Sequence, residues 1–323
     1  MSSQLIISLI VGFIALSKAT NNLKEYTVKL ELNDKKLIYG LLGEHDSRSI
    51  ARCAMMCKRE CVFFGFNTQL KKCRIHKELL TSVMTNEAGW RYYWDDALDF
   101  SSMPKDCKDL HENGQTSTGV YDIYPYSTLT VPITVYCDMT TMGGGWTAIQ
   151  KRLNGSVSFD RTWTEYKTGF GSPEHNVWVG NDVIHQLIKE NSSSLYVSLT
   201  LQNGETLYEM FDRFFVSDEA GKYQLFLAGP ATGTLVNFTG DSMLNTGYPN
   251  ENQAGMYFST PDRDNDRYSG NCAAKYRGGW WFNACHHAFL NGPWYPAEWA
   301  SPWYLKARSG SSVRGTTMMI KRH

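Results

Sequence analysis

Alternating apolar and polar residues near the N-terminus predict a small sheet with one helix. Residues 26–32 alternate as a half-buried strand does. Residues 61–67, 72–75 and 90–94 are rich in aromatic and β-branched side chains, which favours three further strands. Between the first two strands, residues 47–58 are typical of a helix that begins with a serine. We therefore expect a helix packed on an antiparallel sheet.

The eight cysteines fall into two sets and predict two domains. Four of them lie close together (Cys53, Cys57, Cys61, Cys73), and four are widely spaced (Cys107, Cys137, Cys272, Cys285). On the predicted helix, Cys53 and Cys57 are four residues apart and share one face. A polar stretch that ends in Pro104 separates the two sets. We place the domains at 20–98 and 99–323, because 323 residues exceed one typical core.

The first residues have the pattern of a secretion signal. Residues 5–16 are an apolar run too short to span a bilayer, and Ser17 and Ala19 are small residues suited to cleavage. We predict a signal peptide over 1–19, a secreted chain and no membrane span. An even number of cysteines in a secreted chain is typical of disulfides. Asn154, Asn191 and Asn237 begin glycosylation sequons.

The composition excludes several function classes. The chain is 42% hydrophobic, and its 32 basic residues balance its 32 acidic residues, so the net charge is zero. This balance gives no basic stripe for nucleic acid and no general attraction to a membrane surface. The chain has no H-x-x-x-H, G-x-S-x-G, P-loop or G-x-G-x-x-G motif, so no enzyme activity is expected.

An acidic run near the C-terminal third predicts a calcium site. Asp262, Asp264 and Asp266 alternate, which concentrates the hard oxygen ligands that calcium prefers. An EF-hand is excluded, because Arg267 takes the glycine position of that loop and Ala273 the glutamate position.

From residue 106 onward, the sequence resembles the fibrinogen C-terminal domain family, which includes ficolins, tachylectins, angiopoietins and fibrinogen. The motifs in the family's order are Asp106-Cys107, Gly119-Val-Tyr121, Val135-Tyr-Cys137-Asp-Met139, Gly143-Gly-Gly-Trp146, Glu165 to Gly171, Trp178 to Asn181, and Phe258 to Gly292. The resemblance implies an α+β domain with a mixed sheet and a loop-rich calcium- and ligand-binding lobe. Residues 143–145 suit a turn that needs positive φ.

The helix with C-x-x-x-C before a hairpin resembles the PAN/apple family. This resemblance implies the pairs Cys53–Cys73 and Cys57–Cys61, although four cysteines allow three connectivities. The fibrinogen-like resemblance implies a third pair, Cys107–Cys137. We expect Cys272 and Cys285 to close the loop beside the acidic run, which would stabilise it by about 3 kcal/mol.

The fibrinogen-like resemblance also implies the site residues. The cation would bind side-chain oxygens of Asp264 and Asp266 and main-chain carbonyls of Tyr268 and Gly270, with Asp262 as support. In ficolins and tachylectins, which this region resembles, an acetyl methyl enters an aromatic cup while main-chain amides bind the acetyl oxygen.

The residues that match the cup are Tyr276 and Tyr295, and the matching amides belong to Cys285 and His286. The resemblance also implies a cis peptide bond before Cys285. The sequence departs from the family at Phe289 and over 293–304, which puts the acetyl specificity in question. Trp280 and Trp281 are expected to lie in the core.

The leading hypothesis is a secreted, calcium-supported lectin that binds acetylated carbohydrates in innate immune recognition. The alternative is an extracellular protein-binding ligand or matrix component, in which 293–304 would contact a partner. A third option is a venom or haemostasis-active protein. Without a Gly-X-Y repeat or heptads, a homo-oligomer would need another basis.

Overall fold

The protein forms two compact units. The computed structural model describes residues 6–10, 13–17, 23–28, 34–36, 41–57, 61, 63–77, 85–95, 103–126, 132–189, 192–239, 242–244, 247, 249–294 and 313–323. One unit comprises Met1–Met103 with Tyr126–Pro132, and the other comprises Pro104–Pro125 with Ile133–His323. Each unit has its own sheet and its own buried cluster of side chains.

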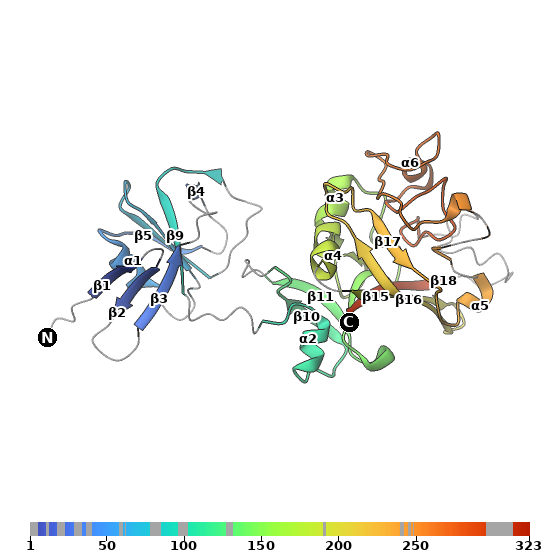
Figure 1. Cartoon of the computed structure of the whole chain (residues 1–323), viewed down its shortest axis with the longest axis horizontal. Coiled ribbons are helices and arrows are strands. Elements are labelled where there is room, and N and C mark those ends of the chain that lie inside the picture. Colours follow the sequence, from blue (N-terminus) through green and yellow to red (C-terminus); the bar gives the residue numbers. More distant parts are fainter. Residues whose placement is uncertain are drawn as a thin grey trace. The chain divides into compact units, whose positions relative to one another are not determined.

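The first unit is an antiparallel sheet with the strand order β1-β2-β3-β9-β6-β7-β5 (Figure 1). Its strands are β1 (Ile6–Ile10), β2 (Phe13–Ser17), β3 (Leu23–Val28), β5 (Leu41–Asp46), β6 (Phe63–Asn67), β7 (Lys72–His76) and β9 (Trp90–Asp95). A second, two-stranded sheet pairs β4 (Lys35–Lys36) with β8 (Thr85–Asn86). The strands predicted at 61–67, 72–75 and 90–94 are confirmed within two residues. Part of the strand predicted at 26–32 lies outside the described residues.

Helix α1 (Ile50–Met56) packs on this sheet and is held by two disulfides. Cys53–Cys73 joins the helix to β7, and Cys57–Cys61 closes the turn after the helix, with the predicted pairing. The predicted start of the helix was wrong by about one turn. The side chain of Ser49 accepts the capping hydrogen bond from the Arg52 amide, so the helix begins at Ile50 rather than at 47.

Strands β1 and β2 fall within the predicted signal peptide. They pair with each other, and β2 pairs with β3 at the edge of the sheet. β3 also pairs with β9, which belongs to the part of the sheet that carries the helix. Removal of residues 1–19 would therefore take two edge strands away and leave β3 as the new edge.

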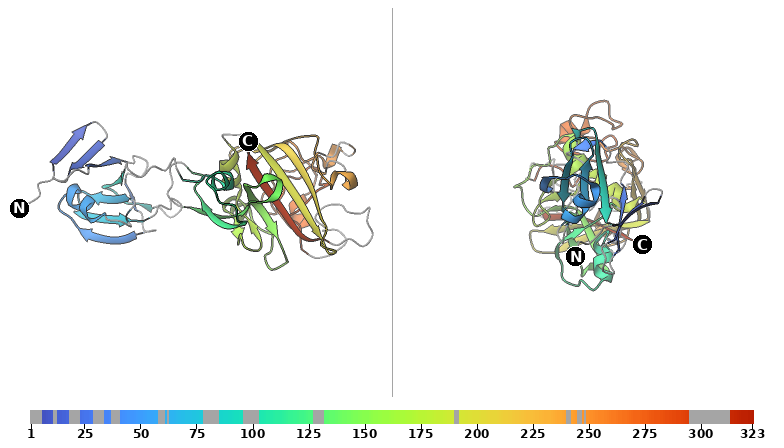
Figure 2. Two further views of the ribbon diagram at one scale, coloured as in Figure 1. Left: turned by 90° about the horizontal axis from the view of Figure 1, so that it is seen from below. Right: turned by 90° about the vertical axis from the view of Figure 1, so that its left-hand side faces the viewer.

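The second unit is built on a nine-stranded sheet whose main order is β10-β11-β12-β18-β15-β16-β17 (Figures 1 and 2). These strands are β10 (Gly119–Ile123), β11 (Ile133–Asp138), β12 (Trp146–Arg152), β15 (Ser193–Leu201), β16 (Thr206–Val216), β17 (Leu225–Ala228) and β18 (Val313–Arg322). The short strands β13 (Phe170–Gly171) and β14 (Val177–Trp178) pair beside β12. The described ladders are antiparallel, and the last strand, β18, lies in the middle of the sheet.

Helices and loops enclose the core of this unit. The helices are α2 (Cys107–Glu112), α3 (Trp163–Thr168), α4 (Asn181–Ile188), α5 (Val236–Thr239) and α6 (Cys272–Tyr276), with short 3-10 turns η4 (Thr141–Gly143) and η5 (Pro249–Glu251). α4 packs on β16 and on α3, and it buries Val183, Ile184 and Ile188. The predicted Cys107–Cys137 disulfide joins α2 to β11. Gly143, Gly144 and Gly145 all have positive φ, as predicted.

Strand β12 ties the core to the loops of the C-terminal third. All seven of its residues are buried, including the polar ones, so their side chains need hydrogen-bond partners. Gln150 donates to the carbonyl of Leu290, and Arg152 donates to the carbonyls of Leu290 and Gly292. The sheet thus fixes the end of the loop that contains the predicted ligand residues.

Candidate functional site

The acidic loop (residues 262–270) is held by its own aspartates. One oxygen of Asp266 accepts a hydrogen bond from the Tyr268 amide (2.9 Å), and the other accepts one from the Cys272 amide (2.8 Å). Asp264 accepts a hydrogen bond from the Asp266 amide. Burial, together with the neighbouring Asp264 carboxylate, raises the pKa of Asp266 to about 6. The loop therefore places the half-buried Asp266 carboxylate beside that of the exposed Asp264, and a cation would relieve the repulsion between them.

Asp262 has a separate, structural role. Its carboxylate accepts hydrogen bonds from the Trp163 amide and from the Thr260 hydroxyl, both at 2.8 Å. Trp163 is the first residue of α3, so Asp262 places a negative charge at the N-terminus of that helix. This contact agrees with the expectation that Asp262 supports the loop.

The donor set fits a hard cation. The predicted ligands are two carboxylates and the carbonyls of Tyr268 and Gly270, which are oxygen donors of the kind that calcium takes. Each hydrogen-bonded oxygen of Asp266 still has a lone pair for a ligand. Among the described residues, no group of three or more His, Cys, Asp or Glu side chains converges.

A disulfide joins the acidic loop to a second loop, which we call the cysteine loop (282–292). Cys272 is the first residue of α6, and its disulfide with Cys285 is the one predicted. Asn271 caps α6 by accepting from the Ala274 amide, and Arg277 ends the helix with φ of 60°. The Ala284–Cys285 peptide bond is cis, as the resemblance implied.

His286 is enclosed by aromatic rings. Its ring centroid lies 4.7 Å from that of Tyr276, 5.0 Å from that of Phe289 and 5.7 Å from that of Phe282. Burial, with the nearby charges of His287 and Lys275, lowers the pKa of His286 to about 4. His286 is therefore a neutral aromatic member of this cluster at physiological pH. Tyr276, at the edge of the cluster, is half-buried.

The predicted cup is described only in part. The structure brings Tyr276, Cys285 and His286 together, whereas Tyr295 and the rest of the altered segment 293–304 after Trp294 lie outside the described residues. Next to Cys285, Asn283 links the cysteine loop to η5 by donating to the carbonyls of Pro249 and Asn252. Trp280 and Trp281 are fully buried, as expected.

Lys275 is a site residue that sequence reasoning missed. Its ammonium lies 5.5 Å from the ring centroid of Tyr268 and 5.1 Å from that of Tyr276. Tyr268 is 43% exposed, so the two rings and the cation form a surface between the acidic loop and the cysteine loop. A capping Asn271 before a short helical run was the sequence signal that could have placed Lys275 and Tyr276 on one element.

The glycosylation sequons differ in their surroundings. Asn154 is exposed, and its side-chain oxygen accepts a hydrogen bond from Asn176. Asn237 is exposed on α5. Asn191 lies outside the described residues.

An antiparallel sheet that carries a disulfide-linked pair of acidic and aromatic loops defines the second unit as a fibrinogen-like domain. Residues 103–323 match the family model described as fibrinogen beta and gamma chains, C-terminal globular domain. The protein therefore belongs to this family. The match does not include residues 1–102, which form most of the first unit, so the PAN/apple interpretation of that unit remains a prediction.

Curated relatives include two named kinds of protein. Human fibroleukin is 45% identical over 192 residues, which is 59% of this chain and 42% of fibroleukin. Angiopoietin-2 from Bos taurus is 38% identical over 250 residues, which is 75% of this chain and 47% of angiopoietin-2. The matched region thus spans slightly less than half the length of each of these two relatives.

Solved structures agree on the fold. The fibrinogen-like globe domain of human ANGPTL6 has a TM-score of 0.59 and 34% identity, over 68% of this chain and 96% of that one. Lamprey fibrin D-dimer, solved with the peptide ligand Gly-His-Arg-Pro-amide, has a TM-score of 0.60 and 33% identity, over 67% of this chain and 73% of that one. In the part of the protein that the structure describes, no helix is long and apolar enough to cross a membrane.

Proposed function

We propose that this protein is an extracellular protein-binding module, in which the fibrinogen-like domain recognises a partner protein. The named relatives, fibroleukin and angiopoietin-2, support this alternative better than the lectin hypothesis. The lamprey neighbour, solved with a peptide ligand, is consistent with recognition of polypeptide by this fold. The module acts by binding rather than by catalysis, and it is secreted.

The observation that carries the proposal is the surface formed by the exposed Tyr268 and Lys275 and the half-buried Tyr276. Tyrosines with a polar tip and an exposed ring are common anchors of protein interfaces. Here the ammonium of Lys275 lies near both rings, so the surface offers apolar area and a positive charge together. This combination suits a protein surface with an apolar side group next to a carboxylate.

Calcium would control this surface through the acidic loop. We propose Asp264 and Asp266 as its charged ligands, with the carbonyls of Tyr268 and Gly270. The bound cation would supply structural charge neutralisation and would order a loop that lacks regular secondary structure. Because Tyr268 would give its carbonyl to the cation, its ring would be fixed for a partner, and less ordering entropy would oppose binding.

The test is a binding screen of the secreted protein against purified extracellular domains of cell-surface proteins, in calcium and in chelator. We expect a partner that binds in calcium, and we expect Tyr268→Ala to weaken it at least about tenfold, as truncation of an interface anchor does. Tyr257→Ala is the matched control, since Tyr257 is a similarly exposed tyrosine (40%) outside both loops. An equal loss of affinity in Tyr257→Ala would count against the proposal. So would partner binding that is the same in calcium and in chelator.

The second candidate is the acetylated-carbohydrate lectin. It is supported by the contact of the half-buried Tyr276 ring with the His286 ring, because an acetyl cup would need an aromatic wall next to the residues whose amides bind the acetyl oxygen. In that case Tyr276→Ala would abolish binding of N-acetylglucosamine while Tyr268→Ala would not.

We also propose that the first unit is a PAN/apple-like contact module and that any homo-oligomer forms without a coiled coil.

A further inference from the structure

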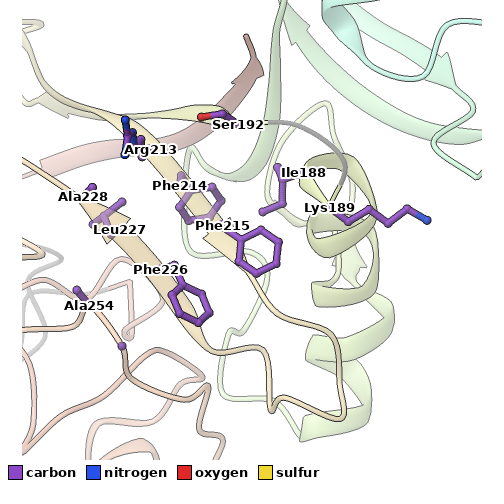
Figure 3. Close-up of a pocket in the computed structure, with 11 residues that line it drawn as sticks. Ile188, Lys189, Ser192, Arg213, Phe214, Phe215, Phe226, Leu227, Ala228 and Ala254 are labelled. Carbon is purple, nitrogen blue, oxygen red and sulfur yellow. The ribbon is translucent and has the colours of Figure 1, made fainter.

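An open trough crosses the outer end of the main sheet. It has a volume of about 750 Å³ and runs over β16 and β17, from the end of α4 to Ala254 and Gly255 (Figure 3). β17 is the last strand of the sheet and has only four residues. The trough therefore lies where the sheet ends.

The floor of the trough is aromatic. Phe215 on β16 and Phe226 on β17 are cross-strand neighbours, with ring centroids 5.5 Å apart. Phe226 is 48% exposed, and Phe215 is half-buried. Two large apolar side chains paired on an open surface mark a place where a further apolar group would bury area.

A second hollow continues the trough toward the acidic loop. Its volume is about 440 Å³, and it shares Ala254 and Gly255 with the first. At its far end it is lined by Arg267 of the acidic loop and by Asn283 of the cysteine loop. The two hollows thus form one surface, here called the edge surface, which reaches the proposed site.

The charged side chains among the described residues that line the edge surface are all positive. No carboxylate is among the described residues that line either hollow, whereas Arg213 and Arg267 line one hollow each. Both arginines are exposed, and neither forms an ion pair with a described residue. The third cation, Lys189, extends away from the strands (Figure 3). An occupant that matches this surface carries negative charge at two separated points and an apolar group between them.

We propose that the edge surface binds an extended, acidic segment of a partner protein. A large apolar residue of the segment packs on Phe215 and Phe226, and its flanking carboxylates pair with Arg213 and Arg267. The open form of the trough favours a polypeptide segment over a small molecule, which would need a more enclosed pocket. This inference extends the proposed function, because it takes the partner to be a protein.

The test uses the full secreted protein and a fluorescent, end-blocked peptide, Gly-Glu-Phe-Glu-Leu-Glu-Gly, followed by fluorescence anisotropy. We expect saturable binding that weakens as salt rises, and an analogue with lysine for each glutamate that does not bind. Each of three variants should lower the affinity for the peptide at least about tenfold, because each removes a contact of the bound peptide or reverses its charge. The variants are Arg213→Glu, Arg267→Glu and Phe226→Ser. Arg213→Gln, a milder change, should lower the affinity less than Arg213→Glu.

Matched controls lie on the same domain but off the edge surface. Arg314→Glu and Val120→Ser change an exposed arginine on β18 and an exposed apolar residue on β10, and they should leave the peptide affinity unchanged. Equal binding of the lysine analogue, or equal affinity in the three edge variants and the controls, would overturn the inference. So would binding of octanoate without binding of the peptide.

The outcome is separable from that of the proposed function. A protein that binds an extracellular domain through Tyr268 but ignores the peptide contradicts this inference alone. A protein that binds the peptide through Arg213 and Phe226 supports the inference, whatever the calcium dependence of the other surface.

Discussion

Asp262 and Asp264 have different structural roles in the acidic loop. Asp262 satisfies the first amide of α3 and the Thr260 hydroxyl, whereas Asp264 is exposed and accepts one amide within the loop. The alternating sequence alone does not distinguish these residues. Their hydrogen bonds identify Asp262 as a carboxylate at the N-terminus of α3, whereas Asp264 is the proposed cation ligand.

Asp262→Ala should lower the free energy of unfolding by about 1 kcal/mol, with or without calcium, because a helix N-terminus loses its acceptor. Asp264→Ala should change little in chelator and should remove the increase in melting temperature that calcium gives. Thermal unfolding of both variants, with and without calcium, measures this. If Asp264→Ala still responds to calcium like the parent protein, the ligand assignment is wrong.

His286 makes stability depend on pH. Its pKa of about 4 in the folded protein lies below the ordinary value of 6.5, so between these values the unfolded protein binds more protons at this residue. Stability that is fully present above pH 6.5 is therefore lost as the pH falls toward 4. The full loss is about 3 kcal/mol, from a shift of this size.

His286→Phe should reduce the difference in unfolding free energy between pH 7 and pH 4.5 relative to the parent protein. Phenylalanine keeps an aromatic ring against Tyr276 and cannot bind a proton. Urea unfolding at the two pH values gives the double difference, in which the opposite contribution of Asp266 cancels. Identical pH profiles in the two proteins would show that His286 is solvated rather than enclosed.

At the scale of elements, β12 positions the cysteine loop. Gln150 is fully buried and donates to the Leu290 carbonyl and to Asn291, while its own oxygen accepts from the Thr316 hydroxyl on β18. One residue thus links the centre of the sheet to the loop that carries the site.

Gln150→Met keeps the shape of the side chain but not its hydrogen bonds. It should lower the free energy of unfolding by about 2–4 kcal/mol, because buried groups on β18 and the cysteine loop lose their partner. Gln115→Met is the control, since Gln115 is exposed before β10 and should change stability by less than about 0.5 kcal/mol. Chemical unfolding measures both. A cost for Gln150→Met as small as the control's would mean that the loop is held elsewhere.

Local pattern predicted some elements better than others. The strands around Phe64 and Tyr93 and all four disulfides were predicted from sequence or resemblance, because aromatic alternation and cysteine order are local signals. The start of α1 was wrong because Ser47 and Ser49 are equally good caps by type, and only the fold selects Ser49. Lys275 was missed although its contacts with Tyr268 and Tyr276 are local, because the short helix α6 was not predicted. The edge surface was missed because it depends on contacts between segments far apart in the sequence.

At the scale of the whole molecule, the fibrinogen-like domain is established and the first unit is not assigned to a family. The predicted signal peptide implies that the secreted protein begins at Thr20, without β1 and β2. Mass spectrometry of the secreted protein would then find no peptide from residues 1–19, and β3 would be the edge strand. Recovery of intact residues 1–19 would instead make β1 and β2 part of the working fold.

The loop-rich lobe is proposed to recognise protein rather than acetylated sugar, and one measurement separates these functions most directly. It is calorimetric titration of the secreted protein with N-acetylglucosamine, in calcium and in chelator, with glucose as the control sugar. We predict no saturable heat at millimolar sugar, although calcium raises the melting temperature of the same sample. Calcium-dependent heat that glucose fails to reproduce, and that Tyr276→Ala abolishes, would contradict this proposal and establish a lectin.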